Sequence, residues 1–246
     1  METPSLVLMS NQEALQRAMD IVANNVANAS TTGFKREAIQ FDTLLTQPAP
    51  GQYTAFVADG ATYRDTSNGP VQMTGNPLDL ALQGDGYFAV QTADGVRYTR
   101  NGSFQLNSQG QIVTLSGDPV LGQGNQPITV PDTTFQINIA SDGDITARVD
   151  NGASLLELGK LTVDKFANEQ GLQATGGGLY TTDQVPQSVQ DPGIVEGALE
   201  QSNVQPVTEI TDMIKIMRAY EQAVNMIGDQ NQRLDQAIDK LSKTTA

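Results

Sequence analysis

Apolar residues recur at alternating spacings of three and four along the last part of the chain. Ten positions between 210 and 241 follow this rule, and only Asn231 among them is polar. A period of 3.5 kept over such a length predicts a helix that packs along other helices. The row consists of Ile210, Met213, Met217, Tyr220, Val224, Ile227, Asn231, Leu234, Ile238 and Leu241. Two interpretations remain open: an interface with other subunits, in which Asn231 fixes register, or one long helix packed on its own domain with Asn231 at a wet edge.

A weaker copy of this pattern occupies the first thirty residues. Pro4 suits the first turn of a helix, and Gly33 marks its expected end. The steps of four and three run through Leu8, Gln12, Leu15, Met19, Val22, Val26 and Ala29. Of these, the positions expected in an assembly interface are Leu15, Met19, Val22 and Val26. The chain is therefore expected to begin and end with a helix.

Between the helices the sequence reads as short β-rich runs separated by turn residues. The clearest hairpin covers residues 87–99, where Asp94-Gly95 predicts a type I′ turn. Strands are also expected over 111–115, 135–139, 144–149 and 158–163. Turns this regular indicate a mostly antiparallel sandwich or distorted barrel. The predicted fold class is mixed α and β, with long N- and C-terminal helices, forming a coiled-coil layer, that flank a central β domain.

The same patterns suggest a division of the chain into five parts. An N-terminal helix is expected over 1–34 and a connecting segment over 35–70. The β domain is expected over 71–185, a flexible linker over 186–205, and the C-terminal helix over 206–246.

Composition excludes several classes of function. The 246 residues include no Cys and no His, so disulfides, thiolate sites and Ser-His triads are excluded and the commonest zinc ligand is missing. We expect no cofactor, no metal site and no catalytic residue. A formal charge of -14 disfavours nucleic acid as a partner. No apolar run reaches the roughly 20 residues of a transmembrane helix, and the N-terminus lacks the pattern of a cleaved secretory signal.

Two acidic glycine motifs have structural interpretations. Residues 84–86, Gly-Asp-Gly, lead into no helix and are expected to form a tight turn rather than a phosphate loop. Residues 142–144, Asp-Gly-Asp, lack the spacing of a calcium loop and are expected to form a hairpin turn.

Polar residues near the end of the first helix are also expected to be structural. Asn24, Asn25 and Asn28 are of a type that caps helices or accepts unusual backbone angles. The adjacent pair Lys35-Arg36 is too short for a nucleic-acid patch and is expected to be a solvated pair of charges at a helix end.

Three stretches are similar to signatures of the bacterial flagellar rod and hook proteins. Residues 24–36 read NNVANASTTGFKR and resemble the signature at the end of the first helix in that family. Residues 74–88, TGNPLDLALQGDGYF, and 98–104, YTRNGSF, resemble its central signature. Near the end, the stretch 199–221 opens with LEQSNV and closes with RAYE, like the C-terminal signature. The three matches occur in the family's order and span nearly the whole chain.

Details of the chain resemble the proximal rod type most. Few residues separate the central signature from the last helix, unlike in hook proteins, which usually carry larger outer domains. The opening METPSL and the absence of Trp resemble proximal more than distal rod proteins. Departures from the signatures are Val26, Ala29-Ser30 and the interruption at Gln205-Pro206.

The resemblance implies a non-catalytic building block of the basal-body rod, the shaft that crosses the periplasm and passes torque to the hook. It implies copies of the same chain and other rod proteins as partners, and export through the flagellar type III apparatus. It also implies that the terminal helices form an inner layer around a central channel. From the marginal stability of single helices in water, we expect both ends to be loosely ordered in the free subunit and to order on packing. Ile227→Asp is expected to block assembly while the β domain stays folded.

Other functions remain open at this point. The same family contains distal rod and hook proteins. From the composition alone, a secreted β domain with carboxylate-only activity on the cell wall is also possible, although aromatic residues that could stack on sugars are few and no carboxylate pair stands out. An adhesive module that binds through the β domain is the third alternative.

Overall fold

The chain folds into two compact units. The computed structural model describes residues 3–49, 52–149 and 154–244, with side chains over 6–41, 61–149 and 154–240. The unit called here the helical unit combines residues 1–27, 37–65 and 205–246. The unit called here the β unit combines residues 28–36 and 66–204. The chain therefore passes from one unit to the other four times, after residues 27, 36, 65 and 204. All but the passage after residue 65 lie in or beside a stretch that resembles a family signature.

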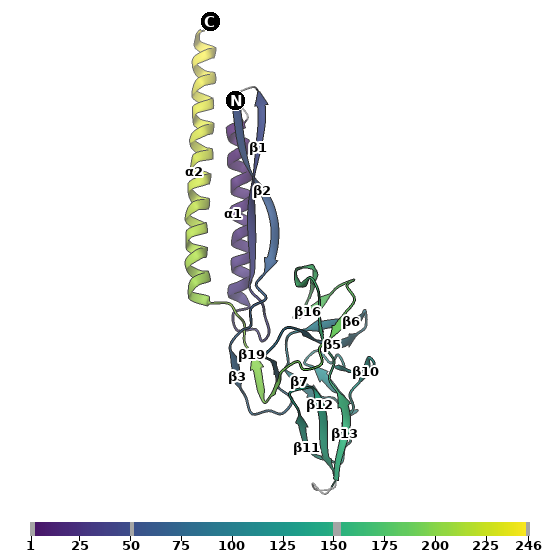
Figure 1. Cartoon of the computed structure of the whole chain (residues 1–246). Helices are drawn as coiled ribbons and strands as arrows, with labels where there is room; N and C mark the ends of the chain where they lie inside the picture. Colours follow the sequence, from purple (N-terminus) through teal and green to yellow (C-terminus); the bar gives the residue numbers. More distant parts are fainter. Residues whose placement is uncertain (1–2, 50–51, 150–153, 245–246) are drawn as a thin grey trace. The chain divides into compact units, whose positions relative to one another are not determined.

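Two helices and one long hairpin make up the helical unit (Figure 1). Helix α1 spans Thr3–Ala27 and helix α2 spans Pro206–Thr244. Strand β1, Glu37–Ala49, pairs antiparallel with strand β2, Gln52–Arg64. Both strands lie along α1. This packing supports the hairpin, because a two-stranded ribbon by itself is only marginally stable in water. The expected helix end at Gly33 is wrong: α1 stops at Ala27, and residues 28–33 turn, with the Thr31 amide donating to the Asn28 carbonyl.

Helices α1 and α2 pack against each other through one face of α2. Buried or half-buried residues of α2 recur every three or four positions, and Ala223 is the most buried of them. This face contains Met213, Ile216, Tyr220, Ala223, Ile227, Gln230 and Leu234. The Gln12 side-chain amide of α1 donates a hydrogen bond to the Tyr220 hydroxyl, 2.9 Å away. At 39 residues against 25, α2 is the longer helix, and its residues 235–240, the last whose side chains are described, are all exposed.

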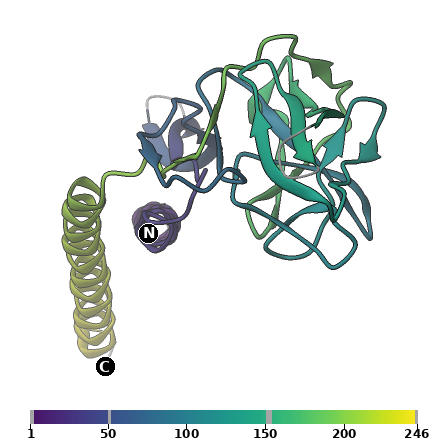
Figure 2. The ribbon, with the colours of Figure 1, turned by 90° about the horizontal axis from the view of Figure 1, so that it is seen from below.

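The β unit is built from a six-stranded sheet, a three-stranded sheet and several strand pairs (Figure 2). The larger sheet has the order β15-β16-β6-β5-β14-β17. Its strands are β5 (Tyr87–Thr92), β6 (Gly95–Thr99), β14 (Val163–Lys165), β15 (Gln173–Gly176), β16 (Leu179–Thr181) and β17 (Gln187–Ser188). The smaller sheet contains β11 (Thr134–Ile139), β12 (Asp144–Val149) and β13 (Ser154–Lys160), in that order.

Four antiparallel pairs complete the β unit. They are β18–β4, β19–β3, β7–β8 and β10–β9. The bounds of these strands are β3 (Val71–Met73), β4 (Leu80–Leu82), β7 (Phe104–Leu106), β8 (Ile112–Thr114), β9 (Leu121–Gly122), β10 (Gln126–Pro127), β18 (Ile194–Glu196) and β19 (Ala198–Glu200). A short 3-10 turn covers Glu169–Gly171. Among the described residues every strand pairing is antiparallel, which agrees with the mostly antiparallel domain expected from the sequence.

One apolar core holds these strands together. Phe88, Ile112 and Ile145 are buried in it, and the Phe88 and Phe104 rings meet edge to face with centroids 5.2 Å apart. A second cluster covers the other side of β5, where Tyr87 and Ala89 contact Phe166 and Tyr180. Because successive residues of a strand point to opposite faces, β5 contributes to both clusters and is buried on both sides.

The expected hairpin over residues 87–99 is confirmed, but its turn type is not. Strands β5 and β6 pair with Thr92 opposite Gly95. A type I′ turn needs positive φ at both central residues, yet among these positions only Gly95, at φ 109°, has a positive φ. The expected strand over 158–163 is also divided, because β13 ends at Lys160 and β14 begins at Val163. Over the residues described, neither helix is long and apolar enough to cross a membrane.

Candidate functional site

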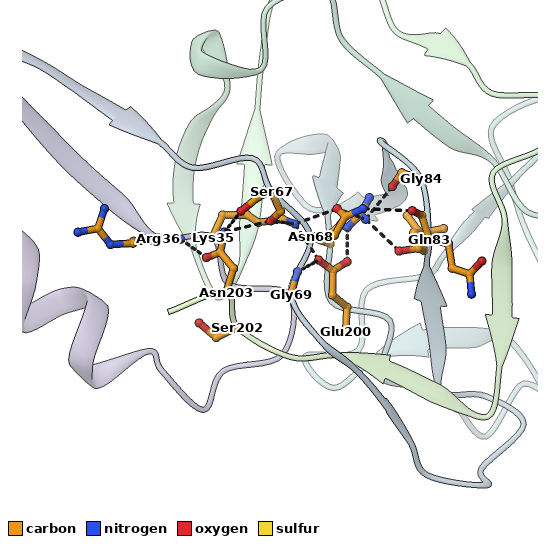
Figure 3. Close-up of polar contacts among 12 residues, drawn as sticks. Lys35, Arg36, Ser67, Asn68, Gly69, Gln83, Gly84, Glu200, Ser202 and Asn203 are labelled. Atoms are coloured by element: carbon orange, nitrogen blue, oxygen red, sulfur yellow. Dashed lines mark hydrogen bonds and ion pairs between the residues drawn. The ribbon is translucent and has the colours of Figure 1, made fainter. Parts of the chain in front are cut away.

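A buried triad of charged side chains lies in the β unit. Glu200, at the end of β19, has an ion pair with Lys35 (Oε1 to Nζ, 2.7 Å) and another with Arg100 (Oε2 to Nε, 2.5 Å) (Figure 3). The side chains of Lys35, Glu200 and Arg100 are only 3%, 1% and 3% exposed. A buried charge requires a charged or hydrogen-bonded partner, and here one carboxylate serves two cations.

The remaining donors of the two cations are taken by oxygens of neighbouring loops. The Arg100 guanidinium donates from Nη1 to the Gly86 carbonyl and from Nη2 to the Gly84 and Leu82 carbonyls. The Asn68 side-chain oxygen accepts from both Arg100 and Lys35, and the Ser67 carbonyl accepts from Lys35. The turn expected at residues 84–86 thus surrounds Arg100, and Gly86, at φ 137°, has a backbone conformation that favours glycine.

Backbone contacts continue the triad into the loops beside it. The Gly69 amide donates to the Glu200 carboxylate at 2.9 Å, and the Gly33 amide donates to the Glu200 carbonyl at 2.8 Å. Asn203 accepts from the Arg36 amide at 2.6 Å and donates to the Ser67 carbonyl at 3.0 Å. The triad therefore ties together residues 33–36, 66–69 and 200–203, which adjoin three of the four passages between units.

The position of Lys35 corrects the interpretation of Lys35-Arg36 as a solvated pair. Lys35 is buried and follows a turn, not a helix end. Burial lowers the pKa of Lys35 below its ordinary value, while the hydrogen bond and negative charge of Glu200 act in the opposite direction. The triad has no local signal in the sequence, because its members lie as far as 165 positions apart. Each of them nevertheless lies in one of the three stretches that resemble family signatures.

A second polar contact is buried in the helical unit, at the end of α1. Asn25 is fully buried, and its side chain forms two hydrogen bonds with Glu37 at the start of β1: the Glu37 amide donates to Oδ1 (2.9 Å), and Nδ2 donates to the Glu37 carbonyl (2.7 Å). Nδ2 also donates to the buried carboxylate of Glu209, in the first turn of α2, at 3.1 Å. This confirms the structural role predicted for Asn25. One amide thereby joins both helices and the hairpin.

Replacing Asn25 by alanine is expected to destabilise the helical unit by about 1–3 kcal/mol, because buried polar groups of Glu37 and Glu209 lose a partner. The measurement is chemical denaturation followed by the helical circular dichroism signal. Asn225→Ala, on an exposed face of α2, is the matched control and is expected to change the free energy of unfolding by no more than about 0.5 kcal/mol. Equal effects of both substitutions would contradict the role of Asn25.

Gly33 is held against Arg100 in a backbone conformation that favours glycine. Its φ is +69°, and a Cβ added there would lie 2.6 Å from the Arg100 carbonyl carbon. Gly177 has a similar φ of +62° but open space around the position of a Cβ. Gly177→Ala is therefore expected to cost about 1 kcal/mol from backbone strain alone. Gly33→Ala is expected to cost about 1–3 kcal/mol more, because backbone must also move. Comparing the two unfolding midpoints separates the close approach from the strain.

The predicted interface row of α2 divides into two faces. Met213, Tyr220, Ile227 and Leu234 lie on the face that packs on α1. The positions three residues before each of them are exposed, namely Ile210, Met217, Val224 and Asn231, and Ile238 continues this row. We call these five residues the outer row. Ile214 is also exposed and lies beside it. Leu241 belongs to α2, but its side chain lies outside those described.

The predicted interface residues of α1 are mostly covered within the chain. Val22 is buried, and Leu15, Met19 and Val26 are half-buried. Ala14 and Ala18 are buried as well, so small residues bring α1 close to the elements beside it. The helical unit thus uses α1 for internal packing and presents apolar surface on α2.

The Asp142-Gly143-Asp144 motif forms the hairpin turn expected of it, between β11 and β12. The Ala140 amide donates to the Asp144 carbonyl, and Gly143 has φ 96°. Lys160 lies 3.5 Å from Asp142 and 3.4 Å from Asp144. The pKa of Asp142 is lowered, chiefly by the hydrogen bond from the Asp144 amide, with a smaller contribution from Lys160.

Three segments of the chain match flagellar protein families. Residues 6–35 match the family described as flagella basal body rod protein. Residues 81–147 match the flagellar hook protein FlgE/F/G D1 domain, and residues 195–240 match the flagellar basal body rod FlgEFG protein C-terminal family. Each of the three segments supplies one member of the buried triad: Lys35, Arg100 and Glu200, respectively.

Curated relatives match the chain along its length. The flagellar basal-body rod protein FlgF of Caulobacter vibrioides is 38% identical over 99% of both chains. The FlgF protein of Mesorhizobium japonicum is 33% identical over 98% of both chains. The flagellar basal-body rod protein FlgG of Agrobacterium fabrum is 35% identical over 87% of this chain and 90% of its own.

Proposed function

Because the chain belongs to the family of flagellar basal-body rod proteins, we propose that it is a structural subunit of the bacterial flagellar basal-body rod and assembles through α2. Its place is the rod of the basal body, together with further copies and other rod proteins. The observation that carries the proposal is the outer row of α2. A rod is a polymer, and a helix with one face on its own chain and a second apolar face exposed is suited to pack on a neighbour.

The spacing of the outer row supports a helix as the neighbour. Its five residues recur every seven positions, the repeat that keeps a seam facing a second helix. Val224 is 42% exposed, and its neighbours in the row are exposed to a similar extent or more. Asn231 interrupts the apolar row near its end. In a buried seam, a single amide of this kind selects register and partner number.

The two buried polar contacts suit a subunit that carries load. The triad fixes the β-unit ends of the connections near residues 36, 66 and 204, and Asn25 fixes the start of β1 and α2 in the helical unit. Charged groups buried with full partners hold one geometry, because any displacement leaves a charge without a partner. We infer that these contacts keep the connections from slipping when torque passes through the subunit.

Further parts of the proposal concern subtype, export and chemistry. We place the subunit in the proximal rod, because its opening residues and its lack of Trp resemble proximal rod proteins. We also propose that it leaves the cell through the flagellar type III apparatus and that it catalyses no reaction. The triad supports this last point, since its charged groups are buried and hydrogen-bonded to one another and to the backbone.

The test is complementation of a motile strain from which the gene has been removed. We expect truncated or missing rods in purified basal bodies, restored together with swimming by the intact chain. A chain that ends before Ile210 keeps the β unit and the Glu209 contact but lacks the outer row, and is expected to restore neither. Complete rods and normal swimming without the gene would overturn the proposal.

A further inference from the structure

The three-stranded sheet of the β unit leaves both of its edges open over part of their length. Within the part of the chain that the structure describes, β11 pairs only with β12, and β13 pairs only with β12. The β11 edge is closed at one end, where the Ile139 amide donates to the Glu196 carboxylate. The β13 edge is closed at Lys160, whose carbonyl accepts from the Gln123 amide. Residues 134–138 and 154–158 remain open.

The hydrogen-bond pattern of the three-stranded sheet fixes which amides and carbonyls of β11 and β13 point away from β12. The Ala140 amide donates to the Asp144 carbonyl, so residues 138 and 136 also point toward β12, and Ile137 points away from it. Along β12, residues that hydrogen-bond to β11 alternate with residues that hydrogen-bond to β13. The pairs Ala147–Leu156 and Val149–Ser154 are therefore hydrogen-bonded, and Leu155 and Glu157 point their amides and carbonyls outward.

A groove lined by apolar and polar residues, Asp132 among them, lies beside the open edge of β11. Its volume is about 470 Å³, and Ile137 and Phe135 form one wall. The other walls come from loops and strand ends that include Pro77, Leu106 and Pro131. Phe135 is 72% exposed and lies at an irregularity in the pairing of β11 with β12, between Thr134 and Gln136. At the same wall the Thr134 hydroxyl is buried and has no hydrogen-bond partner among the described residues. An exposed strand edge beside a groove with apolar walls that can receive side chains is the arrangement used for strand addition.

We propose that the open edge of β13 of a second copy of this chain adds to the open edge of β11, so that the sheet continues from one subunit to the next. Strands β11 and β13 run parallel, because both are antiparallel to β12. Copies repeated head to tail therefore bring the two edges together as a parallel pair. Such a contact is heterologous and does not close on itself, which is what a polymer requires.

The geometry of a parallel pair fits both edges in one register. With Ile137 opposite Leu156 of the second copy, the Ile137 amide and carbonyl meet the outward groups of Leu155 and Glu157. Both Ile137 and Leu156 lie on the core-facing side of their strands, since Ile137, Ala147 and Leu156 are cross-strand neighbours. Leu156, which is 42% exposed in the single chain, would enter the groove beside Phe135.

The charges on the two edges agree with this register. Glu157 is the single charged residue of β13 before Lys160, and it falls opposite Asn138, whose exposed amide can donate to a carboxylate. The open stretch of β11 carries no charge. Within residues 134–138 and 154–158, this register therefore brings no two like charges opposite each other, despite the net charge of -14 on each chain.

Cysteine cross-linking tests the inference, which rests on the proposed function. The chain has no native Cys. Gln136→Cys and Leu155→Cys introduce two thiols on the same face of the sheet, separated within one chain by Arg148 of β12. Two strand spacings amount to roughly 9–10 Å, too far for a disulfide within the chain. Across the proposed contact the two positions lie on adjacent strands, roughly 5 Å apart.

The expected result is a ladder of linked chains when basal bodies carrying the double variant are treated with a thiol oxidant. Each single variant, and the control pair Ala93→Cys with Ser116→Cys at exposed turns of the β unit, is expected to stay monomeric on a denaturing gel. Normal rods and swimming with no linked chains would overturn the inference and leave the proposed function standing. Dimers from one single variant would indicate a two-fold contact and would overturn it as well.

If the double variant fails to assemble, peptide binding is a second test of strand addition at the β11 edge. A fluorescent peptide of residues 154–160, SLLELGK, is expected to bind the purified intact chain with a saturable rise in anisotropy. The same peptide with the equivalent of Leu156→Lys is expected to bind at least about tenfold more weakly, a difference of about 1.4 kcal/mol. Equal binding of the two peptides, or none, would contradict strand addition at this edge.

Discussion

Glu200→Ala is expected to lower the free energy of unfolding of the β unit by about 3–5 kcal/mol, because Lys35 and Arg100 would remain buried without their counter-charge. The Gly69 amide loses its acceptor in the same variant. Urea denaturation followed by tyrosine fluorescence measures the effect, since Tyr87, Tyr98 and Tyr180 belong to the core of this unit. A loss of this size is a large part of the stability of an ordinary domain.

Two further variants separate the charge of Glu200 from its shape. Asp191→Ala removes an exposed acid of the same unit and is expected to change stability by no more than about 0.5 kcal/mol. Glu200→Gln keeps the shape and the acceptor oxygen, and is expected to destabilise nearly as much as Glu200→Ala if the charge is what matters. A Glu200→Gln protein as stable as the original chain would show that the two cations do not need the carboxylate.

Val224→Asp is expected to abolish assembly while leaving the free subunit folded. Val224 lies in the outer row and is exposed, so aspartate there meets water in the free chain and should change stability by no more than about 0.5 kcal/mol. In an interface the same carboxylate would be buried without a partner, at a cost of several kcal/mol. Because about 1.4 kcal/mol corresponds to a factor of ten, incorporation into basal bodies should fall far more than tenfold. Immunoblots of purified basal bodies and swimming assays measure it.

Asn225→Asp is the matched control for Val224→Asp. It adds the same charge to the next residue of the same helix, which is exposed but lies outside the outer row. We expect normal incorporation and normal swimming. Ile227→Asp remains a prediction of lost assembly, but Ile227 lies on the face that packs on α1, so this variant would also disturb the helical unit. Loss of assembly in Asn225→Asp equal to that in Val224→Asp would contradict a role for the outer row in particular.

The periodic parts of the sequence predicted their elements well. The heptad pattern over 210–241 identified α2, and regular turn residues identified the strands β5, β6, β11 and β12 close to their observed bounds. Periodic apolar positions and turn residues are local signals, which a single sequence displays directly. The hairpin of β1 and β2 was not predicted, and residues 35–70 were assigned only as a connecting segment. The two strands pack along α1, and the local pattern of residues 35–70 does not reveal this support.

The two faces of α2 could not be separated from the sequence. A row with steps of three and four contains both the residues that pack on α1, such as Tyr220, and those that do not, such as Val224. Both kinds are apolar, and only the position of α1 distinguishes them. The Lys35 error has a related cause. A lysine next to an arginine after a helix is usually solvated, and nothing local indicates that Glu200 and Arg100 meet it from distant parts of the chain.

The most direct test of the central claim, that the outer row of α2 packs on neighbouring subunits, is a cryo-electron microscopy map of purified basal bodies that resolves side chains. We predict that the apolar residues of the outer row, including Met217 and Val224, lie within about 4 Å of apolar side chains of an adjacent subunit. A map in which this row faces the channel or solvent, with the subunits joined elsewhere, would contradict the account.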